Sequence, residues 1–141
     1  MFPATLRSEI FAVPVADDLH FAEGYAVYRP VGEVPLHVAV AGVTQAIELC
    51  HQHQVKRLLI DATGLIGSRS PSMVERFDIA TEWAMAARGA IKIALVLRPD
   101  LIDPQRFGTT VARNRGLQFD TFASEAEALA WLLDPQTDSP D

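Results

Sequence analysis

One polar loop carries most of the side chains that could do chemistry in this 141-residue chain. It runs from Asp61 to Ser72 and includes the hydroxyl groups of Ser68, Ser70 and Ser72 and the guanidinium of Arg69. A serine at a helix N-terminus can accept a phosphoryl group, because the free backbone N–H groups and the helix dipole favour negative charge there. More often, such a serine is the helix cap. Both interpretations of Ser70 and Ser72 stay open.

A further arginine, Arg98, follows the next apolar segment of the chain. If two neighbouring strands of one sheet precede Arg69 and Arg98, both side chains reach the same edge of that sheet. With the serine hydroxyls they would then form a small anion site for a phosphate or carboxylate group. Solvent-exposed arginines without such a role are more common, so this site is the less favoured alternative.

Asp61 closes the apolar run 58–60 and is followed by Thr63 and Gly64. It could act as a general base or bind a metal ion, but no second carboxylate, histidine or cysteine lies near it in the sequence. A turn in which Asp61 accepts hydrogen bonds from its own loop is therefore favoured. The sequence contains no nucleotide-binding loop, hydrolase elbow or paired-cysteine motif. We predict that the protein is not an enzyme and binds no cofactor or metal.

The composition narrows the classes of partner. The net charge is −6 and the isoelectric point is near 5.1, which disfavours binding to nucleic acid or to an anionic membrane surface. The single cysteine, Cys50, excludes an internal disulfide, and its place on an apolar helical stripe predicts a buried, inert thiol. No signal peptide and no apolar run of membrane-spanning length is visible, so a cytoplasmic protein that does not span a membrane is expected.

The elements that position these residues follow from hydrophobic periodicity. Continuous or alternating apolar residues predict a pair of strands at 6–15 and 25–31, joined by a loop at 16–24, and three further strands at 58–60, 90–97 and 118–122. Three- and four-residue spacing predicts helices at 35–54, from Ser70 or Ser72 to 88, after Asp103 to 116, and from Ser124 to 133.

The predicted order is β-β-α-β-α-β-α-β-α, which indicates the α/β class. We expect a mixed, mostly parallel sheet packed with about four helices. Residues 1–134 should form a single domain, and residues 135–141 a flexible C-terminal tail.

The chain resembles the SpoIIAA-like family of the STAS superfamily over residues 25–133. The resemblance lies in the order of five segments: Gly32-Glu33-Val34 before a helix, VKRLLIDATG, KIALV, FGTTVARNRG and EAEALAWL. It implies a STAS-like fold and a non-enzymatic regulatory or protein-interaction module of unknown specific function. In anti-sigma-factor antagonists, the loop after the central strand carries a D-S-S-G-type motif whose serine is phosphorylated by the partner kinase. Ser70 and Ser72 stand near that position, but Arg69 replaces the preceding aspartate and no glycine follows.

The same resemblance implies a protein partner, and an exposed helix face makes a homodimer a second possibility. CRAL-TRIO lipid-transfer domains are more distant relatives with a similar fold. They imply an alternative function, a carrier of a lipid or another small apolar or anionic ligand held between helices and sheet.

Overall fold

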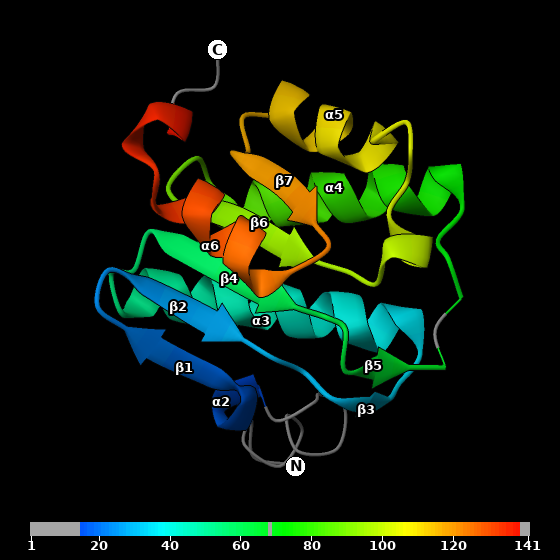
Figure 1. Ribbon diagram of the computed structural model, residues 1–141, viewed down its shortest axis with the longest axis horizontal. Helices are drawn as coiled ribbons and strands as arrows, with labels where there is room; N and C mark the ends of the chain where they lie inside the picture. The colour runs from blue at the N-terminus through cyan, green and yellow to red at the C-terminus, as the bar shows by residue number, and fades with distance from the viewer. Residues whose placement is uncertain (1–14, 68, 139–141) are drawn as a thin grey trace, which may run out of the picture.

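The computed structural model describes residues 15–67 and 69–138, which build one five-stranded sheet covered by helices (Figure 1). The strand order is β1-β2-β4-β6-β7. β1 is antiparallel to β2, and the other neighbours are parallel. The structure therefore confirms a mixed, mostly parallel sheet. The bounds of its strands are Leu19–Ala22 for β1, Tyr25–Tyr28 for β2, Arg57–Asp61 for β4, Lys92–Val96 for β6 and Phe119–Phe122 for β7.

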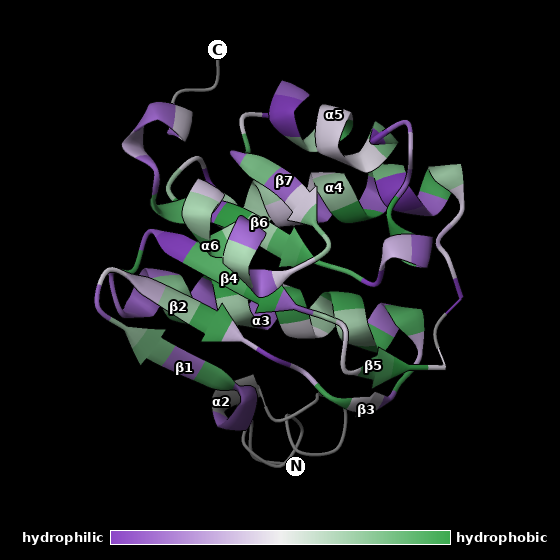
Figure 2. Cartoon of the chain, viewed as in Figure 1, coloured by the Kyte–Doolittle hydropathy of each residue, from purple (hydrophilic) through white to green (hydrophobic). Residues whose placement is uncertain are grey.

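The predicted central strand, β4, is the middle strand of the sheet. Leu58, Leu59 and Ile60 are buried, because helices cover both faces of the sheet at this point. Leu58 lies beside Ile93 of the equally apolar β6. Figure 2 shows the apolar character of both strands.

Four helices cover the sheet unequally. Side chains of α3 (Leu36–Gln52), α4 (Met73–Ala87) and α5 (Phe107–Asn114) pack in the larger core with Leu58 and Ile60. Those of α6 (Glu125–Leu133) pack on the opposite face with Leu59, as the alternation of side chains along a strand requires. The loop after β4 thus connects a strand that faces both layers to the start of α4.

Several short elements complete the described part of the chain. Two-residue strands β3 (Gly32–Glu33) and β5 (Leu65–Ile66) pair in parallel beside the main sheet. A four-residue helix, α2 (Val15–Asp18), precedes β1. Single turns of 3-10 helix span Pro99–Leu101 and Pro135–Thr137.

The prediction of a loop at 16–24 is wrong. This segment holds most of α2 and all of β1, which forms a hairpin with β2 through the turn at Glu23 and Gly24. Gly24 has a φ of 85°, a conformation that glycine adopts without strain. This strand has four residues and only two large apolar side chains. An alternating pattern of that length is too short to indicate a strand. The strand predicted at 6–15 lies outside the described residues apart from Val15, which begins α2.

The C-terminal segment is anchored further than the predicted tail allows. Residues 135–137 form a 3-10 turn, and the carboxylate of Asp138 accepts hydrogen bonds from Arg57 at 2.7 and 3.0 Å and from Lys92 at 2.8 Å. Charge-assisted bonds of this kind hold the segment against the amino ends of β4 and β6. Residues 135–138 of the predicted tail thus contact the sheet in this structure, while residues 139–141 lie outside the described residues.

Candidate functional site

The loop after β4 begins with a turn that Asp61 stabilises. Its Oδ1 accepts hydrogen bonds from the backbone N–H of Thr63 at 2.9 Å and from the Thr63 hydroxyl at 2.6 Å. Gly64 is needed next because a Cβ there would lie 2.8 Å from Cγ1 of Val31. The structure places these residues in the self-bonded turn that the sequence favours.

The side chain of Asp61 lies on the α6 face of the sheet, where the structure brings it beside Glu125. Arg29 donates to both carboxylate oxygens of Glu125, at 2.8 and 2.9 Å. These bonds, with a smaller effect of Asp61, lower the pKa of Glu125 to about 2. Sequence reasoning found no carboxylate near Asp61 because Glu125 is far along the chain.

Ser72 is the cap of α4. Its Oγ accepts a hydrogen bond from the backbone N–H of Glu75 at 3.2 Å, and the Glu75 carboxylate accepts one from the Ser72 N–H at 2.9 Å. Arg69 donates to both oxygens of the same carboxylate, at 2.6 and 2.7 Å. Together these bonds, with that from Arg69 the largest influence, lower the pKa of Glu75 to about 2. The capping box thus engages both Ser72 and Arg69.

Ser70 has a different partner, which sequence reasoning missed. Nη2 of Arg76 donates to the Ser70 hydroxyl oxygen at 2.9 Å, and Nη1 donates to the carbonyl of Pro71 at 2.6 Å. The Arg76 guanidinium therefore reaches back from α4 to hold the loop. Ser68 lies outside the described residues.

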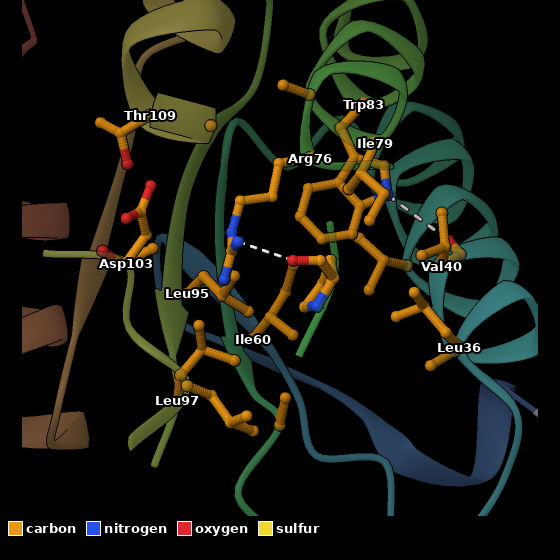
Figure 3. A pocket seen from close by; sticks show the side chains of 18 of the residues that line it. Leu36, Val40, Ile60, Arg76, Ile79, Trp83, Leu95, Leu97, Asp103 and Thr109 are labelled. Atoms are coloured by element: carbon orange, nitrogen blue, oxygen red, sulfur yellow. Dashed lines mark hydrogen bonds between the residues drawn. The ribbon is translucent and has the colours of Figure 1, made fainter. Parts of the chain in front are cut away.

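A cavity of about 180 Å³ lies between the sheet and helices α3, α4 and α5 (Figure 3). Apolar side chains from all of these elements line it, among them Val40, Ile60 and Trp83. Arg69 and Arg98, which the sequence places after two neighbouring strands, both line the cavity with their side chains partly exposed. Asp61 does not line it, so the structure separates Asp61 from the two arginines.

Three other findings concern the buried cysteine, metal binding and membrane spans in the described part of the chain. Burial of Cys50 on α3 raises the pKa of its thiol to about 12, which keeps the thiol protonated, as expected for an inert cysteine. Within residues 15–67 and 69–138, no three histidine, cysteine or acidic side chains are grouped for a metal ion. No helix in these ranges combines the length and apolarity needed to cross a membrane.

Comparison with known proteins identifies the architecture. No protein-family model matches the sequence, and no curated protein matches it. The structure is similar to the crystal structure of an anti-sigma factor antagonist from Mycobacterium paratuberculosis, with a TM-score of 0.56 and 18% sequence identity. The similarity covers 82% of this chain and 92% of that chain. The two proteins share a fold. The STAS-like fold implied by the sequence is therefore confirmed, including its four main helices and mostly parallel sheet.

Proposed function

We propose that this chain is a non-enzymatic regulatory module that binds a protein partner in the cytoplasm through the start of α4. The observation that carries this proposal is a group of apolar side chains exposed at that helix end. Met73 is 61% exposed, Val74 70% and Phe77 39%. Isolated exposed apolar side chains are common, but a group of them beside a functional loop is typical of an interaction site.

The exposure has a structural cause. The second half of α4 buries its small side chains and Trp83 against the sheet, but the first turns extend past the packed core. Arg115, directly after α5, lies beside this surface with its guanidinium 4.7 Å from the centre of the Phe77 ring. We call Ser70, Met73, Val74 and Phe77 the docking surface. Figure 1 places it at the end of the molecule where the parallel strands have their carboxyl ends.

The fold comparison supports a protein as the partner. The similar structure is described as an antagonist of an anti-sigma factor, and therefore acts on a protein. A partner of this kind would bury Met73 and Val74, and the unbranched side chain of Met73 adapts well to an interface.

We propose further that Ser70 is the phospho-acceptor of the docking surface. Ser72 is occupied as the helix cap, whereas the hydroxyl of Ser70 is exposed and, among the described residues, is bonded by Arg76 alone. Arg76 forms no ion pair within the described residues, so its guanidinium can pair with an added phosphate. The phosphate would place about two negative charges beside Met73 and weaken an apolar contact there.

Mass spectrometry of the protein from its own source tests this assignment. We expect an added mass of about 80 Da, the mass of a phosphoryl group, mapping to Ser70. Ser70→Ala should remove it, and Ser72→Ala should retain it while destabilising α4 through the lost cap. A phosphoryl group on Ser72, or an unmodified Ser70 in every growth condition, would contradict the assignment.

Substitution of the docking surface tests the proposed function itself. We expect the double variant Met73→Asp, Val74→Asp to weaken binding of a partner captured from extract by about 30-fold or more, since central apolar contacts dominate interface energies. The affinity would be measured by titration calorimetry with the purified partner. The stability of the variant should change little, because both side chains are exposed.

Met85→Asp is the matched control, because Met85 is exposed to a similar degree but lies near the other end of α4. Its affinity for the partner should equal that of the unchanged protein. Equal affinities for all three proteins would exclude this surface as the binding site. If the unchanged protein without its partner has the molecular mass of a dimer in solution and the double variant has that of a monomer, the occupant of the surface is a second copy of the chain.

A further inference from the structure

The cavity behind the docking surface has the size of a small-molecule site. Its volume is about 180 Å³, and an engineered apolar cavity of about 150 Å³ in another protein holds benzene. Leu36, Val40, Ile79 and Trp83 form one wall, and sheet residues such as Leu95 form another (Figure 3). A membrane lipid with two long acyl chains is much larger than this space. The apolar part of a fitting ligand is therefore compact, about one ring with a short substituent.

One hydroxyl group in the cavity wall is accessible from the cavity. Thr109 of α5 is only 6% exposed, and its hydroxyl oxygen makes no hydrogen bond within the described residues. Figure 3 shows it turned toward the side of the cavity where Asp103 lies. Because a hydroxyl can both donate and accept, it can exchange a hydrogen bond with a polar atom of an occupant.

The cavity also has one cation whose donors are free. The guanidinium of Arg98 makes no hydrogen bond within the described part of the chain, and its nearest carboxylate, Asp100, is 4.0 Å away. By contrast, Arg69 and Arg106 of the same lining are paired with Glu75 and Asp120, and Arg76 donates hydrogen bonds to Ser70 and Pro71. A guanidinium that is 40% exposed at the edge of an apolar space is a suitable partner for a carboxylate.

The charges on the other side of the cavity fix the orientation of a ligand. Past Leu36 and Val40 the space continues into a shallow hollow of about 600 Å³. The carboxylates of Asp78 and Glu82 and the Arg69–Glu75 ion pair line it. An anionic group would be repelled there. Asp103 in the cavity wall is also a carboxylate, but its oxygens accept hydrogen bonds from the backbone N–H groups of Gln105 and Phe107. The anionic end of a ligand is thus directed away from the hollow and toward Arg98.

We propose that the cavity binds a small monocarboxylate with its apolar body against Trp83 and its carboxylate at Arg98. This site is separate from partner binding, and its test uses the protein alone. Failure of the ligand to bind therefore leaves the proposed function unaffected. Failure of a partner to bind at the docking surface likewise leaves the ligand proposal unaffected.

Two-dimensional NMR of the ¹⁵N-labelled protein with phenylacetate as the probe tests the proposal. We expect a dissociation constant of about 1 mM or below, in line with the affinity that a ligand of this size can reach. The indole N–H signal of Trp83 should shift, and that of Trp131, which packs on the opposite face, should not. Phenylacetamide, which has the same shape without the charge, should bind with an affinity at least about fivefold lower.

Two pairs of variants locate the site. Arg98→Gln should abolish the preference for the acid over the amide, whereas Arg88→Gln, which removes a surface arginine paired with Glu48, should retain it. Ala39→Leu should fill the cavity and remove binding, whereas Ala41→Leu, an exposed position on the same helix, should not. The absence of a Trp83 shift in the unchanged protein, equal binding of acid and amide, or unaltered binding by Ala39→Leu would overturn the proposal.

Discussion

Lys92→Met should lower the free energy of unfolding by about 2–4 kcal/mol, because it removes a buried cation on which several acceptors depend. Lys92 is 4% exposed on β6. Its ammonium donates to the carbonyl of Trp131 at 3.0 Å and to the carboxylate of Asp138 at 2.8 Å, and also bonds the hydroxyl of Thr137. It lies 4.5 Å from the centre of the Trp131 ring as well. Methionine keeps the aliphatic volume but leaves these acceptors without their donor.

The only other lysine of the chain provides the control. Lys56 is exposed just before β4, so Lys56→Met should change the free energy of unfolding by less than about 0.5 kcal/mol. Urea unfolding of the three proteins measures both differences. Similar small values for both variants would show that Lys92 does not anchor the C-terminal segment.

Ile60→Ala should lower the free energy of unfolding by about 2–5 kcal/mol. Ile60 is fully buried in the middle strand and lines the cavity, so truncation enlarges a space that is already present. The surrounding helices cannot collapse into the larger space without losing their contacts to Leu58 and Leu95. The cost therefore includes both the lost burial and the added cavity.

Ile66→Ala is the matched control on β5, where the isoleucine is half exposed. Its loss should be about 1 kcal/mol or less, because part of the side chain contacts solvent in the folded state. Thermal and urea unfolding compare the two variants. An equal loss at both positions would contradict the central place of β4 in the core.

The local signals in the sequence predicted much of the fold. The short apolar runs of β4 and β6 favoured strands covered on both faces, because such strands are short and bury nearly every side chain. The sequence left the start of α4 at Ser70 or Ser72, and the structure shows the capping box of Ser72 and Glu75, whose two hydrogen bonds connect residues three positions apart. Ser124, which caps α6, likewise bonds a residue three positions on.

The contacts that sequence reasoning missed join residues that are distant in the chain. Arg57 and Lys92 meet Asp138, and Asp61 meets Glu125, only after the sheet is assembled. The periodicity of the sequence does not indicate pairs that are so far apart, so residues 135–141 were predicted to be a flexible tail. The cavity was not predictable for a related reason, since it depends on how side chains of three helices fail to fill the space above the sheet.

Hydrogen–deuterium exchange of the protein with and without its purified partner tests the central claim most directly. The first backbone N–H groups of α4 have no partner within the helix, so they report on coverage of this surface. The account predicts slower exchange in the complex for residues 69–77 and unchanged exchange in α6. Protection confined to α6 or to the β1–β2 hairpin, with none at 69–77, would contradict partner binding at the docking surface.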